Sequence, residues 1–576
     1  MAQRKEQTLK IAPGLSADYL FAVVVGAIVA SLVIMPLSAV LISSVSPPEA
    51  LPFHFKGFTW ENFWVVFVED PLGQLILNTI QFGAGAMILA FSLGLFFALL
   101  VERTDFPYRS FVYTAMFSAI AFPLIVKVFG WILALSPRAG YVNQLLRSVL
   151  PVEIETGPFD IYTLGGMIFV TGIGLTPLAF MLLAGLVRSQ DPSLEEAAAT
   201  AGANVRRQLQ RVTLPLLMPG LLSVGIYLLM VVIQTLEVPL AIGLTARVPV
   251  LASRLFLLVG GAEGEWPRYG YASALGLAMI AMAVILMWFY FRQTRVAERF
   301  QVITGRGYIP RRIKLGRKRY LLLTAVLFYL LLNPGIPFLS LLWISLAPPY
   351  QPFAWETVSR FSLDAFISVI RMSPVQQALL NTGILTVLAA TASVILALLV
   401  SWVTVRSGLR RIKGLEVLAF LPLPLPGVVM ATAYLLFFAG TPIYGTIWIL
   451  IIANMMLSLP YLTRVMSASL LQIHNELEEA GIVAGATKLV VLRRIIAPLL
   501  IIPLANAWFY TFALALREFS FATVLFANQN RVLTSVMWQL WRSEAIVEAS
   551  ALGVVMVLLL IVMAFPAQIM ISRLTR

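Results

Sequence analysis

Four ionisable residues lie within long apolar runs, where charge is costly and by default indicates function. Glu237 and Glu518 occupy nearly equivalent places in an internal repeat (518 − 237 = 281), and Lys127 and Arg517 are cations at similar depth. Two carboxylates facing a central pathway would suit a cation, whereas Lys127 would suit an anion or would neutralise a glutamate. Arg517 beside Glu518 favours neutralisation. These residues are candidates for a translocation pathway or gate, with a structural ion-pair network as the alternative.

The residues that other chemistries require are missing. The chain has no cysteine and two histidines, His54 and His474, which excludes structural disulfides, thiolate metal sites and an imidazole-rich metal site. It has no Gly-x-x-x-x-Gly-Lys-Ser/Thr phosphate-binding loop, because Gly485-Ala486-Thr487-Lys488 lacks that spacing. No cluster of acids or histidines indicates a membrane enzyme. We therefore expect no catalytic residue, no metal site and no cofactor bound by this chain.

The composition indicates a protein solvated by lipid. Of 576 residues, 60% are hydrophobic and 12% are charged, against about 45–50% and about 25% in soluble domains. One globular core cannot hide this apolar surplus, because cores stop growing beyond roughly 250–300 residues. The net charge of +14 comes from basic residues gathered in a few connecting loops, so we expect membrane lipid as the partner of this surface and no nucleic acid.

Twelve apolar runs are long enough for a spanning helix, which needs about 20 residues. Continuous runs of this kind suit helices and not the alternating strands of barrels. The fold class expected is an all-α membrane protein of about 12 transmembrane helices. The runs lie at 19–43, 73–101, 110–136, 164–187, 216–244, 272–291, 320–346, 377–405, 414–440, 441–465, 498–526 and 549–571.

The loops between the runs predict the orientation of the chain. Segment 292–319 carries ten basic residues and one acid, Glu298, and the other basic loops fall on the same side when the runs are counted alternately. Cytoplasmic loops carry the excess of lysine and arginine. Both termini and the basic linker are therefore expected on the cytoplasmic side.

An internal repeat divides the chain into two related halves. We expect a first half of about six helices at 1–291, the basic linker at 292–319, and a second half of about six helices at 320–576. The offset between the halves changes from 303 to 283, and the difference of 303 − 283 = 20 residues is accommodated by a longer outside loop around 137–163. The paired positions are Asn78-Thr79 with Asn381-Thr382, Pro123 with Pro426, Glu196 with Glu479, Gly202 with Gly485, and Pro215 with Pro498. Duplicated halves of this kind are typical of transporters.

The loops at 188–215 and 466–498 each predict a short helix followed by a sharp turn. In the first copy Asp191 suits the N-cap, acidic residues favour the helix start, and Gly202 lets the chain turn after it. A second short amphipathic helix then leads to Pro215, which opens the next span. In the second copy, Asn475 and Glu478 have the spacing of a capping box.

This pattern of Glu-Ala-Ala, three residues, Gly, nine residues and Ile-x-Leu-Pro resembles the cytoplasmic loop of bacterial ABC importer permeases of the type I fold. The first copy has Val212 in place of Ile, and the second has Gly481 for Ala and Ala497 for Leu. In that family the loop forms the coupling helix, which sits in a groove of the ATPase subunit. The resemblance assigns ATPase coupling to Glu196, Ala197, Ala198, Gly202, Pro215, Glu479, Ala480, Gly485 and Pro498.

The whole chain resembles the fused two-half permeases of ferric iron import. The length, the Phe58-Thr59-Trp60-Glu61-Asn62-Phe63 segment, and Glu237-Val238-Pro239 with Arg517-Glu518-Phe519-Ser520 carry the resemblance. It implies a bacterial inner-membrane permease with a periplasmic binding protein and a homodimer of ATPase subunits, which hold ATP and Mg. Thiamine, aminoalkylphosphonate and polyamine stay open as substrates. An ion-coupled secondary transporter is the alternative of another class, although it has no reason to keep paired coupling loops.

Overall fold

The computed structural model describes residues 17–48, 57–149, 156–189, 197–198, 200–260, 266–298, 313–347, 355–406 and 413–574. The described chain is helical throughout, with one isolated backbone bridge between Thr104 and Ile313. The all-α fold expected from the apolar runs is confirmed.

The helices follow the order of the expected runs. The first half contains α1 (Ala17–Ser44), α2 (Glu61–Trp64), α3 (Leu72–Arg103), α4 (Arg109–Ala121), α5 (Leu124–Leu135), α6 (Tyr141–Val149), α7 (Leu164–Arg188), α9 (Val205–Gln208), α10 (Leu214–Gln234), α11 (Leu251–Gly260) and α12 (Tyr269–Glu298). The second half contains α13 (Lys318–Leu330), α14 (Ile336–Leu346), α15 (Trp355–Val358), α16 (Asp364–Arg371), α17 (Ser373–Arg406), α18 (Lys413–Phe420), α19 (Gly427–Phe438), α20 (Ile447–Leu470), α21 (Glu476–Val483), α22 (Lys488–Val491), α23 (Ala497–Leu499), α24 (Ile501–Arg517), α25 (Ser520–Val524), α26 (Leu533–Arg542) and α27 (Ile546–Leu574).

Several spans are broken where the sequence predicted continuous helices. Within the described residues nine helices are long and apolar enough to cross a membrane, or eleven if each of two bent pairs is one span. The run 110–136 bends by 92° between α4 and α5, and the run 498–526 lies in a pair bent by 80°. The run 414–440 is divided into α18 and α19, and the helix in 216–244 ends at Gln234. The expectation of about twelve unbroken spans is therefore corrected at these four places.

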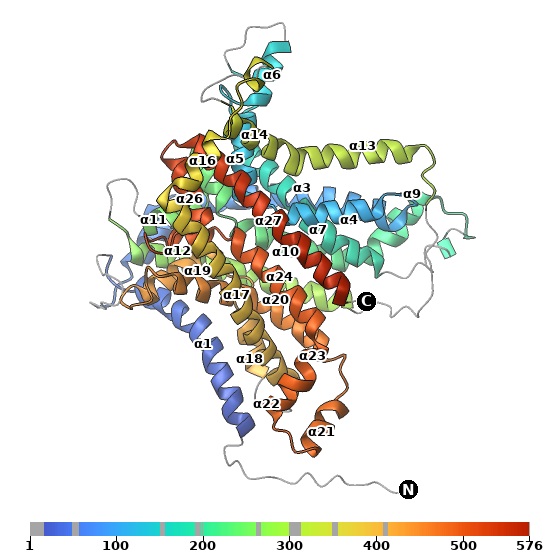
Figure 1. The fold of residues 1–576 in the computed structure, drawn as a ribbon, viewed down its shortest axis with the longest axis vertical. Coiled ribbons are helices and arrows are strands. Elements are labelled where there is room, and N and C mark those ends of the chain that lie inside the picture. The colour runs from blue at the N-terminus through green and yellow to red at the C-terminus, as the bar shows by residue number, and fades with distance from the viewer. Residues whose placement is uncertain are drawn as a thin grey trace.

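The first helix of each half packs against the opposite half. α1 packs on α12 of its own half and also on α17, α18, α19 and α20 of the other half, and α13 runs with α3, α4 and α7 (Figure 1). Two tyrosine hydroxyls form hydrogen bonds between the halves. Tyr329 of α13 donates to the Ile173 carbonyl at 3.0 Å, and Tyr434 of α19 donates to the Leu32 carbonyl at 2.8 Å. The two halves of the sequence are thus interlocked in space.

The repeat recurs as a repeated hydrogen-bond pattern. Thr79 accepts from the Leu251 backbone N–H, and Thr382 accepts from the Leu533 backbone N–H, both at 3.0 Å. The asparagine before each threonine donates to the segment just before α11 or α26. The two Asn-Thr pairs therefore have the same structural role. Each pair holds a short helix, α11 or α26, against the second span of its half by hydrogen bonds.

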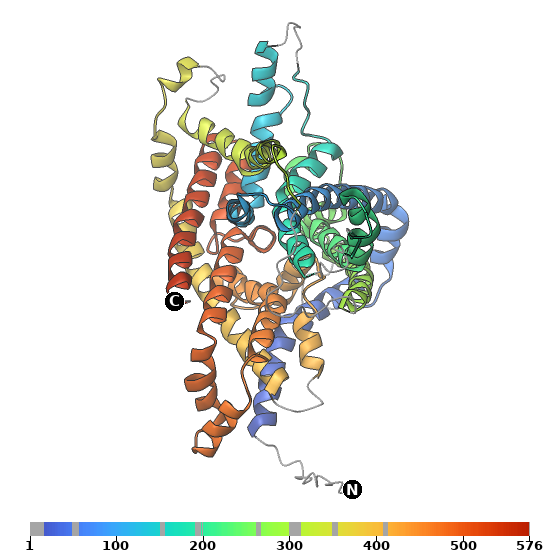
Figure 2. The ribbon, with the colours of Figure 1, turned by 90° about the vertical axis from the view of Figure 1, so that its right-hand side faces the viewer.

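The molecule has distinct extremities. α9 and α21, which belong to the two expected coupling loops, lie at separate edges far from α11 and α26 (Figure 1). α6 projects from the helical body in both views (Figures 1 and 2). It belongs to the segment 137–163, which accounts for the change of offset, and Asn143 anchors it by donating to the Phe159 carbonyl at 2.7 Å.

Candidate functional site

Two bends at equivalent prolines form the centre of the candidate site. Pro123 has φ −59° and ψ 136°, and Pro426 has φ −60° and ψ 134°, so both prolines are extended where a new helix begins. Proline has no N–H and cannot continue the hydrogen bonding of the preceding helix. The carbonyls at the end of the preceding helix therefore lose their intrahelical donors and need others.

Two buried or half-buried cations supply these donors at the end of α4. Lys127 Nζ donates to the Ala119 carbonyl at 2.9 Å, and Arg517 donates to the Ile120 carbonyl at 2.5 Å. Positive charge is favourable at the carbonyl end of a helix. Within the described chain neither cation forms an ion pair with Glu237 or Glu518, so the arrangement differs from the neutralised pair that the sequence left open.

The contact made by Arg517 has a neutral counterpart in the other half. Gln234, at the end of α10, donates to the Leu423 carbonyl at 3.3 Å and lies 3.4 Å from the Pro424 carbonyl. The offsets are those of the repeat: 517 − 234 = 283 and 423 − 120 = 303. The end of the fifth span of each half therefore holds the bend of the opposite half, with a guanidinium in one case and an amide in the other.

The two glutamates lie at the breaks that follow the fifth span of each half. Glu518 lies in the break between α24 and α25, and Glu237 is the first helical residue after the break at Thr235 and Leu236, two residues before the segment Pro239–Gly243. Glu237 accepts from the Leu236 N–H at 3.1 Å, and Glu518 accepts from the Phe521 and Ala522 N–H groups at 2.9 and 3.1 Å. Their role in a pathway or gate stays a prediction.

An aromatic layer lies next to these charges. Phe129 of α5 stacks on Trp541 of α26 with ring centroids 3.9 Å apart, and Phe519 meets Trp538 edge-on at 5.8 Å. These contacts join the bend of the first half to α26 of the second half. The sequence analysis missed this layer, because aromatic residues in apolar runs carry no signal of where they meet.

The two expected coupling loops share one turn geometry. Gly202 has φ +82° and Gly485 has φ +86°. The Ala203 N–H donates to the Ala198 carbonyl, and the Ala486 N–H donates to the Gly481 carbonyl, both at 3.0 Å. A bond of this span around a left-handed glycine is the Schellman C-cap. The sharp turn predicted at both glycines is confirmed, whereas Asp191 and Glu196 lie outside the described residues.

The second loop departs from the first for a packing reason. A Cβ added to Gly481 would lie 2.8 Å from Ile495 Cδ1 and 2.9 Å from Val491 Cγ2. Glycine at this position therefore lets α21 pack closely on the following helical turn. Glu479 and Ala480 are exposed beside it, and Pro498, like Pro215 of the first loop, is exposed near the start of the next span.

The capping box predicted at Asn475 and Glu478 is wrong. Asn475 makes no side-chain cap, and the Glu478 carboxylate forms an ion pair with Arg406 at 3.0 Å, with 13% and 11% of the side chains exposed. Arg406 also donates to the Leu470 and Ile473 carbonyls at 2.8 and 2.6 Å. This arginine, which the sequence suggested only as a topology signal, ties the end of α17 to α20 and α21.

Arg103 is the repeat counterpart of Arg406 (406 − 103 = 303). It donates to the Val187 carbonyl at 3.2 Å, at the end of α7. The repeat offset was the signal that could have identified both arginines as anchors of the fourth span and of the loop that follows it.

Known proteins similar to this chain are transporter permeases. A ferric transport system permease protein of Actinobacillus pleuropneumoniae is 26% identical over 85% of this chain and 70% of its own length. An Fe(3+)-transport system permease protein of Haemophilus influenzae is 25% identical over 81% of this chain and 84% of its own length. A spermidine/putrescine transport system permease of the same species is 24% identical over 46% of this chain and 90% of its own length. No family model matches the chain. Over most of its length the chain is therefore similar to transporter permeases, and its long apolar helices agree with a multi-pass membrane permease.

Proposed function

We propose that this chain is the permease of a bacterial ABC importer that carries ferric iron across the inner membrane. The similarity to two ferric permeases over more than 80% of the chain supports this substrate. The match to the spermidine/putrescine permease spans about half of the chain and supports polyamine import as the second candidate. Thiamine and aminoalkylphosphonate stay open as substrates of the same fold.

The two loops with glycine at φ +82° and +86° carry the coupling part of the proposal. The second loop exposes apolar side chains: Leu477, Ile482 and Val483 are 46%, 44% and 88% exposed. A patch of this kind on a loop outside the spanning helices marks a docking surface for a protein partner. A homodimer of ATPase subunits, holding ATP and Mg, would cover one loop with each subunit.

The remaining partners follow from this function. A periplasmic binding protein would deliver the substrate to the side of α11 and α26, opposite the coupling loops. Both termini and the basic linker would then lie in the cytoplasm with the ATPase, as the distribution of lysine and arginine favours.

Two experiments test the proposal. Purification of the tagged chain from its native membrane should recover an ABC ATPase, whereas the rigorously purified single chain should neither bind nor hydrolyse ATP. Deletion of the gene should abolish ATP-dependent uptake of radioactive ferric iron and leave putrescine uptake intact. If the deletion abolished putrescine uptake alone, the proposed substrate would be a polyamine and not ferric iron. Vanadate-sensitive hydrolysis by the single chain, or uptake that follows an ion gradient without an ATPase, would refute the importer class.

A further inference from the structure

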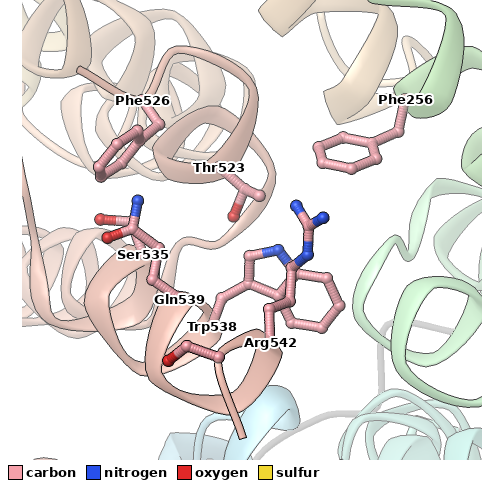
Figure 3. Close-up of a pocket in the computed structure, with 8 residues that line it drawn as sticks. Phe256, Thr523, Phe526, Ser535, Trp538, Gln539 and Arg542 are labelled. Carbon is pink, nitrogen blue, oxygen red and sulfur yellow. The ribbon is translucent and has the colours of Figure 1, made fainter. Parts of the chain in front are cut away.

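A pocket of about 320 Å³ lies between the two halves, on the side away from the coupling loops. Phe256 of α11 faces Trp538 and Arg542 of α26 across this space (Figure 3). Its other lining residues are Thr523, Phe526, Ser535, Gln539 and Ser543. The volume falls at the lower end of the range for small-molecule sites, which is roughly 300–1,000 Å³.

Three lining side chains have hydrogen-bonding capacity that no other described residue uses. Among the described residues, the guanidinium of Arg542 and the amide of Gln539 form no side-chain hydrogen bond or ion pair, and Thr523 Oγ1 is buried without a partner. Arginine offers five N–H donors in a fork, and Gln and Thr add further donors. A fork of this kind matches the paired oxygens of a carboxylate or phosphate group.

The charges around the pocket favour an anion. The described lining contains Arg542 and no carboxylate, and Glu544 is not among the lining residues. The Glu518 carboxylate, which precedes this wall in the chain, is occupied by the N–H groups of Phe521 and Ala522. A bare trivalent cation prefers hard anionic oxygen ligands, and this pocket offers a positive charge instead.

Aromatic side chains shape the rest of the pocket. Phe256 and Trp538 are repeat counterparts (538 − 256 = 282, the offset that also relates α11 to α26). They contribute apolar walls from both halves, and Trp538 lies against Phe519 of the aromatic layer. The pocket therefore fits a compact ligand with an anionic end and an apolar or chelated remainder.

We propose that this pocket binds a small oxyanion-bearing substrate, whose carboxylate, phosphate or phosphonate oxygens contact Arg542, Gln539 and Thr523. If the chain imports iron as proposed above, the ion enters as a complex with oxyanion ligands and not as a bare cation. The place of the pocket on the transport path rests on the proposed import function, whereas anion binding itself does not. Linear polyamines, which carry only positive charge, are excluded from this site.

Binding of labelled phosphate and citrate, and of ferric citrate, to the purified full chain in lipid nanodiscs tests the site directly. The wild-type chain should bind at least one of these anions saturably, and putrescine should not compete. Arg542→Gln should weaken binding by roughly 10- to 100-fold, as expected for a hydrogen bond to a charged group. Arg542→Lys should retain part of it. Arg371→Gln, which changes an exposed arginine of α16 outside the pocket, is the matched control and should bind as the wild type does.

Each outcome bears on a separate part of the proposal. No saturable binding of any of the anions, or equal binding by Arg542→Gln at an unchanged melting temperature, overturns the pocket. Displacement of the anion by added phosphatidylglycerol assigns the site to a lipid headgroup and overturns the substrate role. If the chain binds the anion through Arg542 but transports no iron, anion binding by the pocket is supported and iron is refuted as the substrate. Full iron uptake by Arg542→Gln places the pocket off the path.

Discussion

The glycines of the coupling loops allow a prediction in which backbone conformation is the only variable. Gly202 and Gly485 have φ +82° and +86°, and a Cβ built on either would meet no atom within 4 Å. An alanine there clashes with nothing outside its own backbone. The left-handed region costs a residue with a Cβ roughly 1–2 kcal/mol. A free-energy difference of 1.4 kcal/mol changes an equilibrium constant about tenfold. Alanine should therefore lower the population of this turn by roughly 5- to 30-fold.

A series of substitutions at Gly485 separates backbone strain from bulk. Asparagine enters the left-handed region more readily than other non-glycine residues, so Gly485→Asn should be milder than Gly485→Ala. Gly485→Val should be the most damaging, because branched residues tolerate positive φ least. Gly383→Ala in α17 is the control: its added Cβ also meets no atom within 4 Å and its φ is not positive. It should behave as the wild type does.

The assay is substrate uptake together with ATPase activity of the assembled complex, with membrane insertion measured in parallel. All variants should insert normally, and uptake should fall in the order Asn, Ala, Val while basal ATP hydrolysis by the partner continues. The Gly202→Ala, Gly485→Ala double variant should lose more uptake than either single variant. Wild-type uptake in that double variant, or an asparagine variant as defective as the valine one, would refute the reasoning.

Three further changes test the other contacts of the site. Arg406→Gln removes the ion pair with Glu478 and should lower uptake without loss of insertion; if a double variant with Glu478→Gln loses much more than either single variant, the two residues do not act as a pair. Gly130→Ala would place a Cβ 2.3 Å from a backbone oxygen of α14, so the yield of folded protein in fluorescence size exclusion should collapse, and a normal elution profile would contradict this packing. Joint replacement of Glu237 and Glu518 by Gln breaks no ion pair but removes one of the two Glu518 oxygens that accept from the Phe521 and Ala522 N–H groups, so the melting temperature should fall only by the loss of one hydrogen bond while uptake slows; full uptake at full stability would remove both glutamates from the mechanism.

The sequence predicted the helices well and their breaks poorly, for a physical reason. Apolar length determines whether a segment lies in lipid, so α3, α7 and α17 match their runs closely. A break inside an apolar run leaves the composition unchanged. Pro123 was recognised as a repeated position, but Pro36 and Pro177 lie inside helices, so proline alone does not locate a bend. The donors that stabilise the bend at Pro123 come from distant residues, which only the fold brings together.

The coupling loops show the same division between local and distant causes. The glycine turn is a local property of the backbone, and the sequence predicted it. The capping box failed because Glu478 has a competing partner, Arg406, which lies at the end of a different helix. This chain has Gly481 where the family pattern has alanine, because the helix packs closely on Val491 and Ile495 at this position. Neither cause is visible in the loop itself.

The glutamates Glu237 and Glu518 are repeated in both halves, but three cations occur once, where an exact repeat would place each of them twice. Arg517, Lys127 and Arg542 correspond through the repeat to Gln234, Met430 and Gly260 (517 − 283, 127 + 303 and 542 − 282). Each cation thus has a neutral counterpart, although the surrounding hydrogen bonds repeat from half to half. In a homodimer each charge would occur twice near the axis, and like charges at close range repel. One chain can instead keep the symmetric frame that bends the helices and carry each of these three charges once. An anionic substrate entering between α11 and α26 would meet Arg542 before it reached the bend.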